Sequence, residues 1–264
     1  MARLTFTIDG PSGTVTLRAM LLAFQNQLSI LGDLDAALAG RSEPILDWYV
    51  ADLQMGSVAA TLESRPRAEE FVIGHDRSVV RTYRNGLGVI EGEGRSPAYY
   101  SERSLRAAKS TLKLIGREGV TGFHVSGDGP EPLVLTAQAA VNVDQLVRPA
   151  RKSLGSVEGR LNMISLAGAR PKFEVYDALT KKPVACRFEP AMLEAVKEAL
   201  GRRVFVSGMV TYNRRGEPLR VALDAPIRVL RDRAQLPSTD DIERHYPTLT
   251  GTLSTRDYLE AIRE

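Results

Sequence analysis

The sequence predicts an α+β fold: an N-terminal mixed α+β domain, residues 1–152, followed by a five-stranded β-barrel, residues 153–233, and a short helical C-terminal tail, residues 234–264. In the first part, segments with strand alternation are interspersed with segments of helical spacing. In the second part, three strand patterns, one helix and two strand patterns follow each other. A length of 264 residues with 43% hydrophobic and 25% charged residues suits such a globular protein.

The first part combines strands that alternate with helices that have recognisable ends. Ser101 is a candidate N-cap, and Gly40 and Gly116 are expected to end helices. Alternating apolar residues predict strands over 3–8, 45–53 and 57–64, and a hairpin around 127–130. Helical spacing is expected over 14–38, 75–90, 101–115 and 137–150.

The second part has the element order of an OB-fold, a small barrel with a helix between strands three and four. Pro190 is expected to open that helix and Gly201 to close it. Gly159 and Gly208 lie inside strands, where a tightly coiled barrel needs small residues. Strands are expected over 156–165, 172–177 and 183–188. A hairpin over 201–223, with its turn at 213–216, is expected to supply strands four and five, the last extending brokenly to Leu230. A generic antiparallel barrel of another topology is the alternative.

Two stretches of this part, EGRLNMISLAGARPKFEVYDALTKKPVACRF and GRRVFVSGMVTYNRRGEP, resemble a recurring C-terminal module of uncharacterised bacterial proteins. The similarity extends weakly into the N-terminal half through DWYVADLQMGSVAATLE. The resemblance covers most of the chain and implies a shared architecture with an OB-fold-like module. It implies no activity.

Charge is unevenly distributed along the chain. Residues 148–233 contain 18 Lys or Arg against 9 Asp or Glu, giving +9, whereas the rest contains 17 against 23, giving −6. This asymmetry predicts an anionic partner for the second part. The alternative is a solvated basic surface balanced by an acidic neighbouring domain.

The sequence contains no pattern typical of an enzyme, so we expect a non-enzymatic protein without cofactor or metal. Its three histidines, His75, His124 and His245, are far apart, and the phosphate-loop, zinc-protease and hydrolase motifs do not occur. The lone cysteine, Cys186, is expected to be a buried structural thiol. One cysteine, no secretory signal and no long apolar run together suggest a cytoplasmic protein without a membrane span.

A candidate nucleic-acid interface follows from the expected barrel, because OB-folds bind ligands across strands two and three between the loops after strands one and four. Alternation predicts that Lys172, Glu174 and Tyr176 face outward there. Cations track phosphates and aromatic rings stack on bases, so we expect a single-stranded nucleic-acid site. Its candidate residues are Arg170, Lys172, Tyr176, Arg187, Tyr212, Arg214 and Arg215. Against this, the face carries at most two aromatic residues, and Glu174 would repel phosphate.

The C-terminal tail supports a second hypothesis. STRDYLEAIRE, from Ser254, begins with a capping residue and has an apolar stripe, formed by Tyr258, Leu259 and Ile262. A helix this short must dock on something, by default on its own domain, or alternatively on a partner protein. The chain is therefore alternatively a protein-interaction module or an antitoxin-like regulator that binds a partner protein through this tail.

Overall fold

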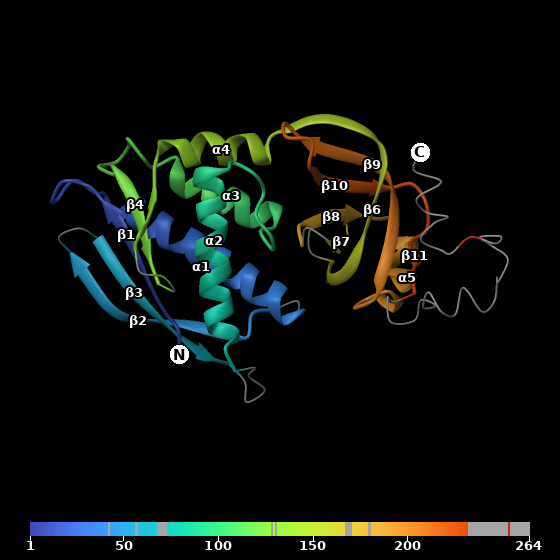
Figure 1. Cartoon of the computed structure of the whole chain (residues 1–264), viewed down its shortest axis with the longest axis horizontal. Helices are drawn as coiled ribbons and strands as arrows, with labels where there is room; N and C mark the ends of the chain where they lie inside the picture. The colour runs from blue at the N-terminus through green and yellow to red at the C-terminus, as the bar shows by residue number, and fades with distance from the viewer. Residues whose placement is uncertain are drawn as a thin grey trace. The chain divides into compact units, whose positions relative to one another are not determined.

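A computed structural model describes residues 1–41, 43–55, 58–67, 73–127, 129, 131–166, 171–178, 181–231 and 253. Met1–Val229 forms one compact unit and Leu230–Glu264 a second. The first unit contains five α-helices and two β-sheets among the residues described. The predicted mixed α+β fold is confirmed at this level (Figure 1).

The first sheet has the strand order β2-β3-β1-β4-β5, and each neighbouring pair is antiparallel. One face is buried: Leu4, Phe6 and Ile8 of β1 are in the core, whereas the residues between them are only partly covered. α1 and α2 lie on one side of this sheet (Figure 1). Its strands are β1 (Arg3–Asp9), β2 (Leu46–Met55), β3 (Val58–Pro66), β4 (Gly122–Ser126) and β5 (Leu133–Leu135).

The helices of this half begin and end at residues that explain their limits. The Thr16 hydroxyl accepts a hydrogen bond from Ala19 N–H, and the Ser101 hydroxyl accepts one from Ser104 N–H. Gly40 ends the first helix with a left-handed φ of 65°. The four helices are α1 (Leu17–Ala39), α2 (His75–Gly92), α3 (Glu102–Leu112) and α4 (Ala137–Val147).

The junction after α4 differs from the prediction, which extended this helix to Ala150. The helix ends at Val147, and β6 (Pro149–Ser165) starts two residues later. Pro149 disfavours the helical conformation at the residue before it, and Arg148 is extended with φ −81° and ψ 120°. The first strand of the second sheet therefore starts seven residues earlier than predicted, at Pro149 instead of Ser156.

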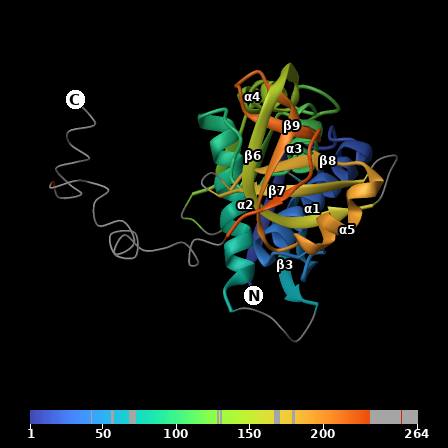
Figure 2. The same ribbon diagram turned by 90° about the vertical axis from the view of Figure 1, so that its right-hand side faces the viewer.

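The second sheet has the strand order β10-β8-β7-β6-β9-β11, with an additional pairing between β10 and β9. β8 and β10 are parallel, and all other pairs are antiparallel. Figure 2 shows β6 and β9 side by side. The remaining elements are β7 (Lys172–Asp177), β8 (Pro183–Arg187), a 3-10 turn (Pro190–Met192), α5 (Leu193–Glu198), β9 (Arg203–Asn213), β10 (Pro218–Leu223) and β11 (Arg228–Val229).

The inward face of this sheet is the one that alternation predicts. Phe173, Val184 and Cys186 are buried in a second hydrophobic core, separate from that of the first sheet. The pKa of the Cys186 thiol is raised by burial, as expected for a structural cysteine. Two interior glycines permit close backbone approach: a Cβ at Gly159 would overlap the Tyr176 carbonyl oxygen, and one at Gly208 would overlap that of Ala222.

Within the described part of the chain, no helix combines the length and the apolar character needed to cross a membrane.

Candidate nucleic-acid interface

The β9–β10 hairpin presents Arg214 and Arg215 to solvent, as predicted. Its turn is built by the side chain of Asn213, whose Oδ1 accepts hydrogen bonds from the backbone N–H groups of Arg215 and Glu217, each at 2.9 Å. Gly216 follows with φ +78°. Because the turn does not use the arginine side chains, both guanidinium groups are left for other contacts.

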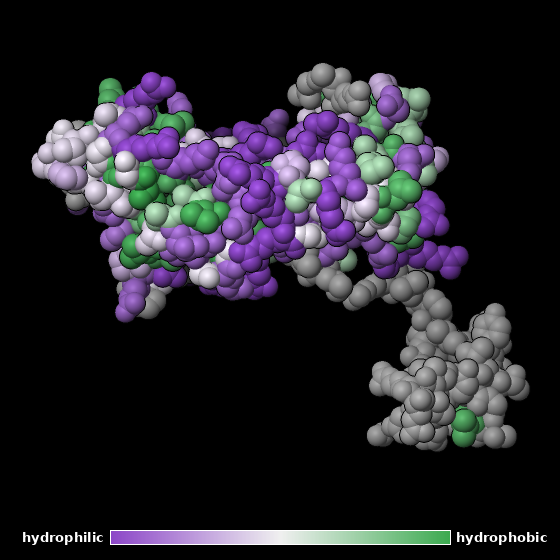
Figure 3. Space-filling view, turned by 90° about the horizontal axis from the view of Figure 1, so that it is seen from above, coloured by the Kyte–Doolittle hydropathy of each residue, from purple (hydrophilic) through white to green (hydrophobic). Residues whose placement is uncertain are grey.

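The first residues of β6 lie beside this hairpin and add cations to it. In the β6–β9 register Pro149 pairs with Asn213, Arg151 with Tyr212 and Lys152 with Thr211. We call the resulting cluster of exposed cations the basic edge; its members are Arg148, Arg151, Lys152, Arg214 and Arg215. In Figure 3, hydrophilic residues cover the middle of the face seen from above, where α4 continues into β6 in Figure 1. Arg148, Arg151 and Lys152 were not among the predicted site residues, because the first strand of this sheet was expected to begin only at Ser156; Pro149, which disfavours a helix before it, is the signal for the earlier start.

The basic edge has little acidic neutralisation. Arg148 Nε pairs with Asp144 Oδ2 at 2.6 Å, and Lys109 Nζ lies 2.5 Å from Asp144 Oδ1. The hydrogen bond from Lys109 is the main reason why the pKa of Asp144 is lowered. The other four cations of the basic edge have no ion pair with an acidic side chain among the residues that the structure describes. The Arg151 guanidinium instead lies over the Tyr212 ring.

Arg215 also contacts the first half of the chain. Its Nη2 lies 2.7 Å from the position that a Cβ on Gly94 would occupy, and Gly94 itself has φ +59°. Glycine at this position therefore serves both the backbone conformation and the approach of the guanidinium to the end of α2.

A partly buried carboxylate holds the base of the hairpin. Glu217 accepts hydrogen bonds from Ser96 Oγ at 2.6 Å, Lys182 Nζ at 2.5 Å and Asn213 Nδ2 at 2.9 Å. Burial opposes ionisation of Glu217, but these hydrogen bonds outweigh it, and its pKa is lowered. Asn213 Nδ2 also donates to the Leu146 carbonyl at 3.2 Å. The orientation of the basic hairpin is thus set from both halves of the chain.

The structure separates Lys172 and Arg187 from the basic edge. The two residues face each other across β7 and β8, at the start of β7. The hairpin lies near the other end of β7, because Asp177 N–H bonds the Lys182 carbonyl and Lys182 pairs with Glu217. Five strand residues span about 17 Å. The predicted residues therefore form two groups and not one surface.

The prediction that Tyr176 and Glu174 are exposed is wrong. Tyr176 is 6% exposed and its ring centre lies 6.4 Å from that of Tyr99, while Glu174 is 7% exposed. Alternation places both residues on the outer face of β7, as expected, but the first half of the chain covers that face. Burial raises the pKa of both side chains; Asp33 on α1 adds to the effect on Glu174, and Lys172 opposes it.

A further contact links the same two halves: Arg220 Nη2 of β10 donates to Glu102 Oε1 of α3 at 3.0 Å. The face predicted to bind bases at Tyr176 is thus occupied by the protein itself. Four predicted site residues, Arg170, Tyr258, Leu259 and Ile262, lie outside the described residues. The tail-binding hypothesis accordingly stays a prediction.

His75 and Cys186 are both buried in the described part of the chain. The Nε2 of His75 lies 2.6 Å from Asp35 Oδ1. Within the described ranges, no three His, Cys, Asp or Glu side chains are grouped so that they could hold a metal ion.

Comparison with known proteins adds little to this description. No family model matches the chain, and no curated protein matches it. A solved structure, OBody NL8 bound to hen egg-white lysozyme, aligns with 30% of this chain and 97% of its own at 14% identity, with a TM-score of 0.25. A likeness at that score carries no conclusion about fold or function.

Proposed function

We propose that the second sheet is an OB-type barrel and that its basic edge binds the phosphate backbone of single-stranded nucleic acid. The observation that carries the proposal is that four exposed cations, Arg151, Lys152, Arg214 and Arg215, lie at the start of β6 and in the adjoining β9–β10 turn, with Arg151 over the Tyr212 ring and no acidic ion-pair partner among the described residues.

The strand pairings support the barrel. β6 pairs with β7 and β9, β7 with β8, β8 with β10, and β10 with β9, so each of these five strands has two neighbours. The helix lies between the third and fourth strands of this set, as in an OB-fold.

The chemistry of the basic edge supports a phosphate-bearing ligand. Guanidinium groups bind phosphate oxygens through paired, charge-assisted hydrogen bonds, and three of the four cations are arginines. Tyr212 is half-buried with Arg151 over its ring, so a planar group lies among the cations. Single-strand binders combine cationic tracks with such stacking surfaces. Because backbone contacts carry no base information, we expect binding without strong sequence preference.

Fluorescence polarisation of a labelled single-stranded 20-mer, at several salt concentrations, tests the proposal. The double change Arg214→Ala/Arg215→Ala should weaken binding to all sequences alike. It should also reduce the slope of log affinity against log salt by about 0.7 for each phosphate that the variant no longer neutralises. The matched control is Arg18→Ala/Arg117→Ala, which removes two exposed arginines outside the basic edge.

Two results would contradict the proposal. One is an equal loss of affinity in the double variant and in the control, which would indicate attraction by overall charge alone. The other is wild-type binding no tighter than the nonspecific range of about 10⁻⁴ to 10⁻⁶ M, unchanged in the double variant.

A further inference from the structure

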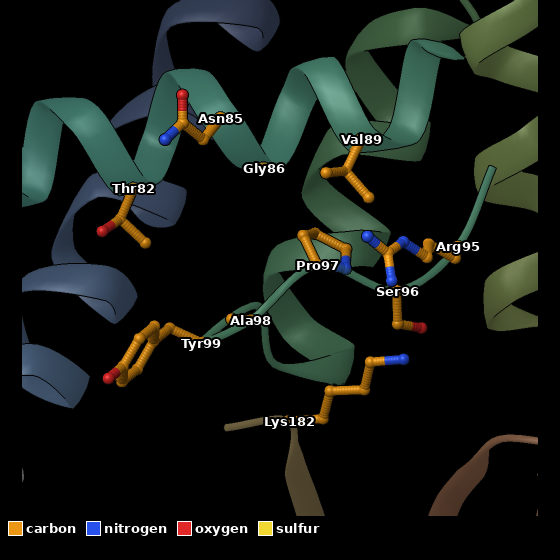
Figure 4. Close-up of a pocket in the computed structure, with 10 residues that line it drawn as sticks. All are labelled: Thr82, Asn85, Gly86, Val89, Arg95, Ser96, Pro97, Ala98, Tyr99 and Lys182. Atoms are coloured by element: carbon orange, nitrogen blue, oxygen red, sulfur yellow. The ribbon is translucent and has the colours of Figure 1, made fainter. Parts of the chain in front are cut away.

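A pocket of about 400 Å³ lies next to the basic edge, between α2 and the segment 95–99 (Figure 4). This volume is within the range of small-molecule sites, and such sites occur preferentially where two parts of a protein meet. Its lining comes from α2, from the segment after it and, through Lys182, from the β7–β8 connection.

The walls combine apolar surface with polar groups. Val89 points from α2 toward Pro97, and the Arg95 guanidinium lies near both (Figure 4). Thr82 and Asn85 have no side-chain hydrogen bond within the described part of the chain. These are the components of a site for a planar polar molecule: apolar walls and a few donors and acceptors for its edge.

Positive charge is in slight excess around the pocket. Arg95 pairs with Glu93, and Lys182 pairs with Glu217. The Arg95–Glu93 pair is more than half exposed on both sides, so it contributes little and a phosphate can compete with it. Arg215 reaches Gly94, the residue before Arg95, and brings a third cation.

The backbone at the pocket is unusual. Tyr99 and Lys181 both have left-handed φ values, 65° and 57°, and the Tyr99 N–H donates to the Lys181 carbonyl at 2.9 Å. A bulky residue in this region is an outlier, and such conformations cluster at ligand sites. The contact of the Tyr99 ring with Tyr176 holds the conformation in place.

We infer that this pocket receives one nucleotide of the strand bound along the basic edge. The base lies against the apolar walls within reach of Thr82, and its phosphate lies at Arg95. Arg215 joins the two sites, because it belongs to the basic edge and contacts the residue next to Arg95. This inference rests on the proposed function and adds a second kind of contact, to the base, at a separate place.

Titration of the full-length protein with AMP, UMP and inorganic phosphate, followed by NMR chemical shifts, tests the pocket without a strand. We expect the nucleotides to bind more tightly than phosphate by at least about tenfold. Ala98→Trp, which fills the pocket from an exposed position, should abolish nucleotide binding. Thr82→Leu should weaken it, and Ala191→Trp, at another exposed alanine, should leave it unchanged.

The 20-mer assay separates this inference from the proposed function. Ala98→Trp should weaken 20-mer binding and lower its salt slope by no more than about 0.7, because only the phosphate at Arg95 is lost, whereas Arg214→Ala/Arg215→Ala should lower the slope by about 0.7 for each phosphate lost along the basic edge. A wild-type protein that binds the 20-mer but not the nucleotides, or binds phosphate as tightly as AMP, overturns the pocket inference alone. Nucleotide binding without 20-mer binding overturns the proposed function, and with it the claim that the occupant belongs to a strand.

Discussion

The guanidinium carbon of Arg151 lies 4.6 Å from the centre of the Tyr212 ring, and the two residues are direct partners in the β6–β9 register. Such a cation–π contact contributes about 0.5 to 1 kcal/mol at an exposed site. It also holds the guanidinium over the ring, so that a bound strand meets the cation and the aromatic group at one place.

We predict that Arg151→Ala and Tyr212→Leu weaken 20-mer binding in different ways. The arginine change should lower the salt slope by about 0.7. The tyrosine change should cost about 1 to 3 kcal/mol of binding free energy with little change in slope. In the double variant the two effects should not add, because the residues touch each other.

The chain offers a matched control for this pair. Arg228 lies 4.3 Å from the centre of the Phe205 ring in the β11–β9 pairing, outside the basic edge. Arg228→Ala should leave the affinity and the salt slope nearly unchanged. Equal effects of the two arginine changes would mean that the basic edge has no special role.

Tyr176→Ala should lower the stability of the folded protein, and it should not serve as a test of base stacking. Truncating a buried aromatic side chain costs about 3 to 5 kcal/mol of unfolding free energy, and Tyr176 is buried against Tyr99. Urea denaturation measures this destabilisation, and Tyr49→Ala, at a 46% exposed tyrosine, is the control with a small effect. If Tyr176→Ala left the unfolding free energy unchanged, the outer face of β7 would be open, as alternation alone suggests.

Glu174→Gln should stabilise the protein at neutral pH. Burial raises the pKa of Glu174 above its usual 4.5, and among the described residues its Oε2 has no hydrogen-bond partner. When the pKa of a group is higher in the folded than in the unfolded protein, the group's contribution to the free energy of unfolding is fully present below the unfolded pKa. That contribution is lost as the pH rises through the folded pKa. Glutamine does not titrate, so the variant should gain about 1 to 3 kcal/mol over wild type at pH 7 and nothing at pH 4.

Glu217→Gln is the control of opposite sign for this experiment. The pKa of Glu217 is lowered, so its stability is present above pH 4.5 and is lost as pH falls through the folded pKa. This variant should be less stable than wild type at pH 7, and the difference should shrink in acid. Urea denaturation from pH 3.5 to 8 measures the unfolding free energy of both variants. A gain in Glu174→Gln that does not depend on pH would contradict the raised pKa of Glu174.

Local patterns were sufficient for much of the fold. The Ser101 cap, the end of α1 at Gly40 and the inward direction of Phe173 and Cys186 all follow from interactions within a few residues along the chain. Period-two alternation assigns each strand residue to a face, and that assignment was correct for Tyr176 as well.

The sequence by itself therefore determined the element order, the buried faces and the confinement of positive charge to the second part. Only the tertiary structure decided what covers each outer face, and so buried Tyr176 and Glu174 against residues of the first half. It also brought Arg151 beside Tyr212, 61 residues later, through the long pairing of β6 with β9. The physical reason is that strand pairing and the packing of one half on the other depend on contacts between distant residues, which leave no periodic trace in the local sequence.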